Sequence, residues 1–281
     1  MRLARQLLYV KRHAFSLVFT TGRDDLFEIG KEGKLNSGIY TAYSGMKALS
    51  DALEITANNI ANLNTVGFKG DRSFNTLLRD EIKDSGVPSE IGRTINRSIR
   101  TDLSINYSDG DMLSTGRNLD VAIRGDGFLT INTPNGERYT RNGNMHLDTN
   151  SMLRTAEGNP VLGVSGRPIV LPGIGEVHIS DSGGVYQDGE EVDRLRIVTF
   201  QDRSQLEKEG DSLFVSKNGA APTISTGAVV RSGYLEGANV NAVRSMVEMI
   251  GIMRHFEAIQ RSVSHEQNDM NNKVIERLGR G

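Results

Sequence analysis

The sequence predicts an α+β protein in which a Gly-rich β body lies between two amphipathic helices, one towards each end of the chain. Apolar residues recur at alternating steps of four and three over residues 42–63 and again over 249–270, where Glu266 interrupts the row; this is the spacing of a coiled-coil seam. Between these stretches, over about residues 111–232, the apolar period drops to two. Turn dipeptides recur there about every 8–12 residues, as in an all-β sandwich or barrel.

The first 35 residues follow neither pattern. Their start is basic, and a short apolar run, Ala14–Phe19, comes after it. This run is short for a signal peptide, and no A-x-A-like cleavage site follows it. We therefore expect residues 1–35 to be a disordered extension or the product of a misassigned start.

The first helix is expected over residues 38–63, with Ser37 as its N-cap. Its exit, residues 62–67, is rich in Asn and Gly, which tolerate left-handed backbone geometry. Phe74, Leu77, Leu78 and Ile82 then follow at helical spacing. We expect a short second helix over residues 72–83 on that account.

The rest of the chain divides into an arm, a body and a last helix. Residues 84–110 are polar and weakly alternating, so we expect an extended arm or linker. The β-rich body follows over 111–237, with hairpins such as the one that turns at Asn135-Gly136. A long helix is expected over 240–278. Residues 36–83 and 238–281 would then form one discontinuous helical domain, with the N- and C-terminal helices paired as a coiled coil.

Each seam needs a partner helix, because a narrow apolar stripe is unstable in water. Additional apolar residues beside the second seam, including Met246, Ile250 and Met253, make it wider than a two-stranded coiled coil requires. This width favours contact with several neighbours. The candidate subunit-contact residues are Met46, Leu49, Leu53 and Ile60 in the first seam and Met249, Ile252, Phe256, Ile259 and Val263 in the second.

Composition argues against several other classes of protein. The net charge is −2, which gives no electrostatic reason to expect nucleic acid as a partner. The sequence contains no apolar run of the ~20 residues that a membrane span needs. The five histidines are scattered without metal-ligand spacing, cysteine is absent, and no G-x-S-x-G occurs. We expect no enzyme activity and assign no catalytic residue, cofactor or metal.

Several stretches resemble the axial proteins of the flagellar rod and hook family. The run from Ala57 to Lys69, ANNIANLNTVGFK, resembles the N-terminal signature of that family, and LDVAIRGDGF at 119–128 resembles its β domain. LEGANVN at 235–241 and MVEMI at 246–250 are similar to the start of its C-terminal helix. The residues that carry the motifs are Asn58, Asn59, Asn62, Thr65, Gly67 and Phe68, followed in the body by Gly125, Asp126, Gly127 and Phe128.

The resemblance implies a structural subunit of the basal-body rod, the drive shaft between motor and hook, most like the proximal-rod F type, with the distal-rod G type next. It implies export through the flagellar type III apparatus to the periplasm or cell wall, without membrane insertion. The partners would be copies of the chain itself and other rod and hook subunits. The asparagines would satisfy backbone groups where the helix meets the body.

Two rival functions remain open at this point. One is a secreted wall- or carbohydrate-binding β domain that dimerises through coiled-coil helices. The other is a hydrolase with a carboxylate pair in the β body, which would need a cleft containing both groups.

Overall fold

The computed structural model describes residues 36–79, 97–173, 175–210 and 212–278. The predicted extension over 1–35 and residues 84–96 of the predicted arm lie outside these residues. The chain divides into two compact units. The larger unit contains Leu49–Asn75 and Thr101–His255, and the described residues of the smaller unit are 36–48, 76–79, 97–100 and 256–278.

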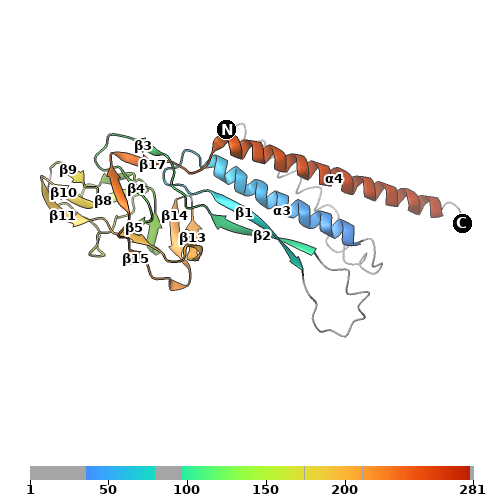
Figure 1. Ribbon diagram of the computed structural model, residues 1–281, viewed down its shortest axis with the longest axis horizontal. Helices are drawn as coiled ribbons and strands as arrows, with labels where there is room; N and C mark the ends of the chain where they lie inside the picture. Colours follow the sequence, from blue (N-terminus) through green and yellow to red (C-terminus); the bar gives the residue numbers. More distant parts are fainter. Residues whose placement is uncertain (1–35, 80–96, 174, 211, 279–281) are drawn as a thin grey trace. The chain divides into compact units, whose positions relative to one another are not determined.

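The two predicted helices are confirmed: the first begins and ends two residues earlier than expected, and the second begins two residues later and ends as expected. Helix α3 covers Asn36–Ala61, and helix α4 covers Ala242–Leu278 (Figure 1). The start of α4 is capped by Asn241, whose Oδ1 accepts a hydrogen bond of 3.0 Å from the amide of Arg244. After α3 the chain turns, and Gly67 adopts the left-handed backbone (φ +69°) that the Asn- and Gly-rich exit predicts.

The predicted helix over 72–83 is wrong where the structure describes it. Residues Asp71–Arg79 form strand β1, which pairs with strand β2, Arg97–Ile105, in a two-stranded sheet. The segment carries Ser73, Asn75 and Thr76, which have weak helix propensity. Pairing with β2 also supplies backbone partners that an isolated helix of this length would not keep. Part of the expected extended arm is therefore a regular strand.

The rest of the β structure lies in the larger unit. Its strands are β3 (Met112–Ser114), β4 (Val121–Arg124), β5 (Phe128–Thr133), β6 (Gly136–Thr140), β7 (Met145–Leu147), β8 (Leu153–Thr155), β9 (Val177–Ile179), β10 (Gly184–Gln187), β11 (Glu190–Arg194), β12 (Ile197–Thr199), β13 (Leu206–Glu209), β14 (Leu213–Ser216), β15 (Thr223–Ile224), β16 (Val229–Ser232) and β17 (Tyr234–Glu236). Two 3-10 turns, η2 (Arg203–Gln205) and η3 (Lys217–Gly219), interrupt them.

These strands pair in several antiparallel sheets. One six-stranded sheet has the order β13-β14-β6-β5-β12-β15, and a three-stranded sheet has the order β11-β10-β9. Strands β16 and β4, β17 and β3, and β7 and β8 form further pairs. The predicted α+β class is confirmed. The sandwich or barrel form of the body and the coiled-coil pairing of the helices stay predictions.

The core of the larger unit has an aliphatic and an aromatic part. The aliphatic part centres on fully buried residues such as Ile123, Leu129 and Val161. In the aromatic part, the rings of Phe128 and Phe214 lie 5.3 Å apart, centroid to centroid, in an edge-to-face arrangement. This core holds the ends of β4, β5 and β6 in fixed positions, and those ends carry part of the site described next.

Candidate assembly faces and the polar joint

Helix α4 presents its predicted seam on one face. Among the residues of α4 whose side chains are described, a half-buried row recurs at steps of four and three, with exposed residues between its members. This row is Met249 and Ile252 in the larger unit and Phe256, Ile259 and Val263 in the smaller unit. Within the smaller unit, Gly45 of α3 lies so close to Ile259 that an added Cβ would be 3.7 Å from its Cδ1 atom. The structure therefore places all five predicted residues of this seam on one half-buried face.

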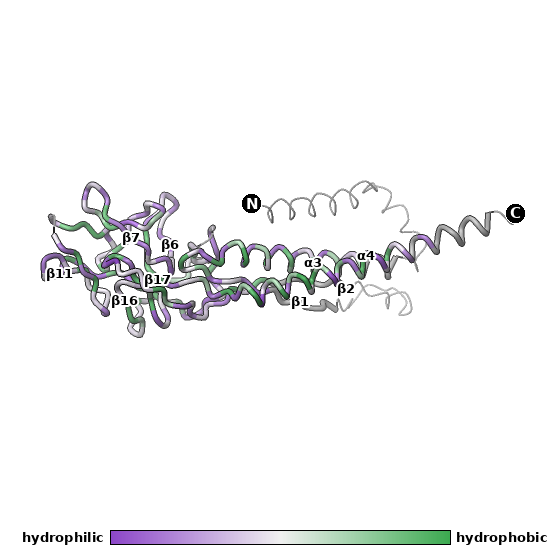
Figure 2. Tube along the Cα trace, turned by 90° about the horizontal axis from the view of Figure 1, so that it is seen from above, coloured by the Kyte–Doolittle hydropathy of each residue, from purple (hydrophilic) through white to green (hydrophobic). Residues whose placement is uncertain are grey.

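A second apolar row on α4 is exposed. The exposed fraction of the side chain is 73% for Val243, 66% for Val247, 49% for Met246, 47% for Ile250 and 37% for Met253. At ~100° of rotation per residue these positions form a row that starts beside the half-buried seam and extends to the far side of the helix. Figure 2 shows apolar and polar residues interspersed along both helices. We call this row, Val243, Met246, Val247, Ile250 and Met253, the outer stripe.

Helix α3 is buried most strongly at small residues. Ala48, Ala52 and Thr56 are 4–8% exposed, and the hydroxyl of Thr56 donates to the carbonyl of Ala52 at 2.9 Å. The predicted contact residues Met46, Leu49, Leu53 and Ile60 are all half-buried. The burial of α3 is thus centred beside the predicted seam, on side chains that allow a close approach of neighbouring atoms.

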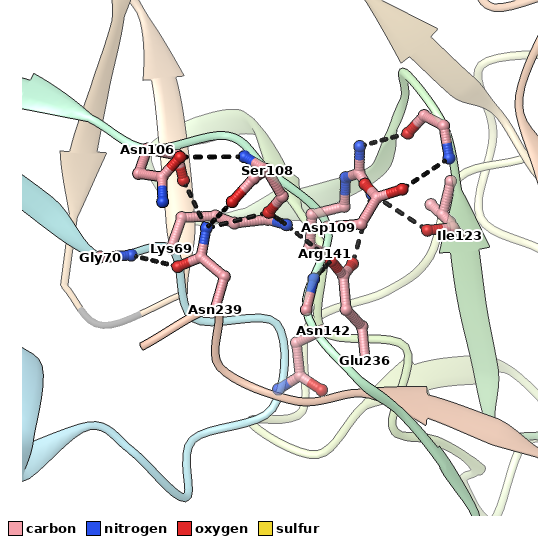
Figure 3. A network of polar contacts seen from close by, with 12 residues as sticks. Lys69, Gly70, Asn106, Ser108, Asp109, Ile123, Arg141, Asn142, Glu236 and Asn239 are labelled. Carbon is pink, nitrogen blue, oxygen red and sulfur yellow. Dashed lines mark hydrogen bonds and ion pairs between the residues drawn. The ribbon is translucent and has the colours of Figure 1, made fainter. Parts of the chain in front are cut away.

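Within the larger unit, four segments distant in the sequence meet at a largely buried polar cluster (Figure 3). We call this cluster, formed by Lys69, Asp109, Arg141, Glu236 and Asn239, the polar joint. The ammonium of Lys69 lies 2.6 Å from the Oε1 atom of Glu236 and donates to the carbonyl of Ser108 at 2.7 Å. Both charged side chains are 1% exposed. Burial lowers the pKa of Lys69, and the nearby Glu236 carboxylate opposes that shift.

Arg141 connects the same carboxylate to the β body. Its Nη1 atom lies 3.2 Å from the Oε2 atom of Glu236 and 3.0 Å from the carbonyl oxygen of Ile123. Its Nη2 atom donates to the carbonyl of Gly125 at 2.6 Å, and its Nη1 atom lies 3.6 Å from Asp109. The guanidinium also lies over the ring of Phe128, 5.3 Å from its centroid. Arg141 thereby joins strands β4, β5 and β17.

The asparagine motif holds the start of β1. The side-chain amide of Asn59 donates to the carbonyl of Asp71 at 2.8 Å and accepts from the amide of Asp71 at 2.9 Å, as a neighbouring strand would. Asn62 donates to the carbonyl of Asn58 at 3.2 Å and accepts from the hydroxyl of Thr65 at 3.0 Å. Asn59 and Asn62 thus bind backbone groups, as the sequence suggested, whereas Asn58 is exposed.

Gly67 and Phe68, which precede Lys69 in the chain, also contact the segments that meet at the joint. The amide of Gly67 donates to the carbonyl of Glu236 at 2.7 Å. Phe68 is 1% exposed, and the ammonium of Lys208 lies 4.4 Å from the centroid of its ring. The motif residues therefore connect the exit of α3 with the end of β17.

The body motif GDGF forms the turn between β4 and β5. Gly125 adopts the left-handed region (φ +84°), and a Cβ on Gly127 would lie 2.6 Å from Ile197. Asp126 forms an ion pair with Arg203. Phe128 lies in the aromatic core. These four residues therefore have structural roles, as expected for a motif that forms a β-turn.

Sequence reasoning singled out neither Lys69, Arg141 nor Glu236 as functional residues. A signal was available for Lys69 and Glu236, because each is a charged residue inside a motif block with apolar or Gly neighbours. The pairing between them was not available, because Lys69 and Glu236 are separated by 167 positions.

The rival functions gain no support from the described residues. A depression of about 470 Å³, lined by Glu176, His178 and Asp188 among others, is open to solvent. Its two carboxylates are exposed, and Asp188 accepts a hydrogen bond from the backbone amide of Glu176. Within the described ranges no group of three or more His, Asp or Glu could hold a metal ion. Neither described helix has an apolar stretch long enough to cross a bilayer.

Comparison with known families gives three matches along the chain. A family described as flagella basal body rod protein matches residues 39–69. The D1 domain of the flagellar hook protein FlgE/F/G matches residues 122–187. The C-terminal family of flagellar basal body rod FlgEFG proteins matches residues 231–277. The first and third matches contain α3's exit and most of α4, and the second lies in the β body.

Individual relatives with rod-protein names are similar to this chain over most of their length. The flagellar basal-body rod protein FlgF of Caulobacter vibrioides is 32% identical over 247 residues, which is 88% of this chain and 99% of the relative. FlgG of Bacillus subtilis is 36% identical over 244 residues, covering 78% of this chain and 91% of the relative. FlgF of Escherichia coli is 31% identical over 245 residues, covering 82% and 94%.

Proposed function

The chain belongs to the family of flagellar basal-body rod proteins, and we propose that it joins its neighbours in the rod through the apolar faces of α3 and α4. As a member of this family it is a structural subunit of the bacterial flagellar basal body. The expected likeness to the F type, with the G type next, agrees with the names of the relatives.

The outer stripe of α4 carries this proposal. A helix that only paired with α3 would need one narrow apolar face, yet α4 has a half-buried seam and also an outer stripe, extending from beside the seam to the far side of the helix, that is 37–73% exposed. Exposed apolar side chains in a contiguous row mark a binding surface. Neighbouring rod subunits are the partners that family membership makes available, and the same apolar chemistry on α3 offers them a complementary surface.

The contact residues follow from this arrangement. Neighbouring copies, or other rod and hook subunits, would cover the parts of the two seams that the folded chain leaves exposed. The seam residues are Met46, Leu49, Leu53 and Ile60 of α3 and Met249, Ile252, Phe256, Ile259 and Val263 of α4. Residues 36–83 and 238–281 would form the helical assembly domain, and residues 111–237 would form the outer wall. A heterologous interface that does not close generates a helical filament, which suits a shaft that transmits torque. Delivery through the flagellar type III apparatus is part of the same proposal.

The test replaces one outer-stripe residue by a charged one. Ile250→Asp places a carboxylate on the exposed face of α4, so the isolated chain should keep its helix content and its Tm. A row that must become buried between subunits would not tolerate the charge. The expected result is a folded chain that no longer forms rods or supports swimming in the source bacterium.

Two further variants make the test specific. Ser262→Asp puts the same new side chain at an exposed polar position of α4 and should swim normally. Phe256→Asp disturbs the half-buried seam and should abolish assembly as well. Normal motility of the Ile250→Asp strain would refute the assembly role of the outer stripe.

A further inference from the structure

The polar joint holds more buried positive than negative charge. Lys69 and Arg141 are 1% and 2% exposed, and both contact the single buried carboxylate of Glu236, which is 1% exposed. The second carboxylate nearby, Asp109, is 45% exposed. Glu236 therefore compensates two buried cations at once. Most other ion pairs described in the body have at least one exposed partner, and exposed pairs such as the one between Arg231 and Asp181 contribute little to stability.

Glu236 also lies where both helix connections reach the β body. The connection that leaves α3 and the connection that leads into α4 run past each other here, joined by hydrogen bonds between them. The amide of Gly67 donates to the carbonyl of Glu236, and the amide of Asn239 donates to the carbonyl of Phe68 at 3.3 Å. The amide of Gly70 donates to Oδ1 of Asn239 at 2.8 Å. Glu236 Oε1 additionally accepts from the amide of Gly110 at 2.9 Å.

We propose that Glu236 is a positioning residue that fixes both helix connections to the β body, so that the joint carries load without acting as a hinge. The inference rests on the proposed rod function, because a shaft subunit transfers torque between its helices and its body through these connections. A buried carboxylate shared by two cations suits this role, since Lys69 cannot leave it without becoming an unpaired buried charge and Arg141 would keep only the half-exposed Asp109. Water cannot take over the contact while the site stays closed.

The number of buried charges in the joint predicts the order of Tm among its variants. Glu236→Gln leaves Lys69 without its counter-charge and leaves Arg141 only the half-exposed Asp109, 3.6 Å away, so it should lower Tm by about 10 °C. Lys69→Met leaves Arg141 paired with Glu236, and Ser108 keeps a second donor in Asn239, so its effect should be less than half as large. The double variant Lys69→Met/Glu236→Gln should be more stable than Glu236→Gln alone. Lys69→Arg, which retains the charge, should stay close to the parent chain.

Amide hydrogen exchange on the full chain measures how often the joint opens locally. In Glu236→Gln the amides of Gly67, Gly70 and Gly110 should exchange at least about tenfold faster, while amides in β5 and β6 keep their rates. The matched control is Val161→Ala, a cavity in the aliphatic core that lowers Tm without touching the joint. In the control the three joint amides should not be selectively faster.

Motility under load completes the test. Cells carrying Glu236→Gln should make rods but swim more slowly than Val161→Ala cells in viscous medium, and adding Lys69→Met should restore part of the speed. Equal exchange at the joint in Glu236→Gln and Val161→Ala, or a double variant no more stable than Glu236→Gln, would overturn the proposal. If Glu236→Gln alone does not fold, a double variant that folds would support the charge argument, and a double variant that also fails to fold would contradict it. The exchange measurement uses isolated chains, so it is independent of whether the outer stripe mediates assembly.

Discussion

Replacing Gly67 by alanine should destabilise the larger unit far more than the same replacement at Gly116. Both glycines adopt nearly the same left-handed backbone, with φ of +69° and +68°. They differ in their surroundings. A Cβ on Gly67 would lie 2.4 Å from both the carbonyl carbon of Arg141 and the amide nitrogen of Asn142, whereas a Cβ on Gly116 would have nothing within 4 Å. Gly116→Ala thus isolates the backbone cost, and Gly67→Ala adds a collision with main-chain atoms.

The magnitude follows from these two contributions. An L-residue in the left-handed region costs about 1–2 kcal/mol, and this applies at both positions. At Gly67 the segment must also move, which breaks the 2.7 Å hydrogen bond from its amide to the carbonyl of Glu236. Leaving a buried donor unpaired costs about 1–3 kcal/mol. The free energy of unfolding should therefore fall by about 2–5 kcal/mol for Gly67→Ala, against about 1–2 kcal/mol for Gly116→Ala.

Thermal unfolding followed by circular dichroism measures the difference. At about 2–4 °C per kcal/mol for a domain of this size, Gly67→Ala should lose about 4–20 °C in Tm and Gly116→Ala about 2–8 °C. Equal losses for the two variants would show that the close approach of the Gly67 backbone to Arg141 and Asn142 does not constrain this position. The assignment of the motif glycine to a packing role would then fail.

Two further predictions concern neighbouring parts of the larger unit. Asn59→Asp removes the donor to the carbonyl of Asp71 and should cost about 1–3 kcal/mol, whereas Asn64→Asp, at an exposed position of the same motif, should leave Tm unchanged; equal Tm values for the two would contradict the clamp on β1. Burial raises the pKa of Tyr107, so above about pH 10 the unfolded chain binds fewer protons than the folded chain, and stability falls as pH rises. The free-energy advantage of the parent chain over Tyr107→Phe should therefore shrink between about pH 9 and pH 11, and a constant difference in urea unfolding would count against this origin.

The helices and the turn chemistry were predictable from the sequence because their determinants are local. The half-buried seam of α4 runs through Met249, Ile252 and Phe256 as the alternating steps of four and three predict. The turn at Gly125-Asp126-Gly127 and the hairpin at Asn135-Gly136 likewise follow from residues that accept a positive φ. In each case a few adjacent positions specify the backbone.

The parts that could not be predicted depend on distant partners. Residues 71–79 have apolar residues at helical spacing, yet β2 and the amide of Asn59 make the segment extended. Lys69 and Arg141 could each have been a solvated surface residue by composition alone. Their burial is possible only because Glu236, far along the chain, lies beside both. Tertiary pairing therefore overrode local propensity at β1 and created the joint.

The two helices use their apolar residues differently, and this decides which variants separate folding from assembly. In α3 the most buried positions are Ala48, Ala52 and Thr56, whose small side chains contribute little apolar area. The larger residue Leu53 remains half-exposed beside them, so a charge there would disturb both the folded chain and any neighbour. Ile250 on the outer stripe is 47% exposed and lies roughly opposite the half-buried seam of α4. A carboxylate at Ile250 therefore acts on assembly with the least effect on the folded subunit.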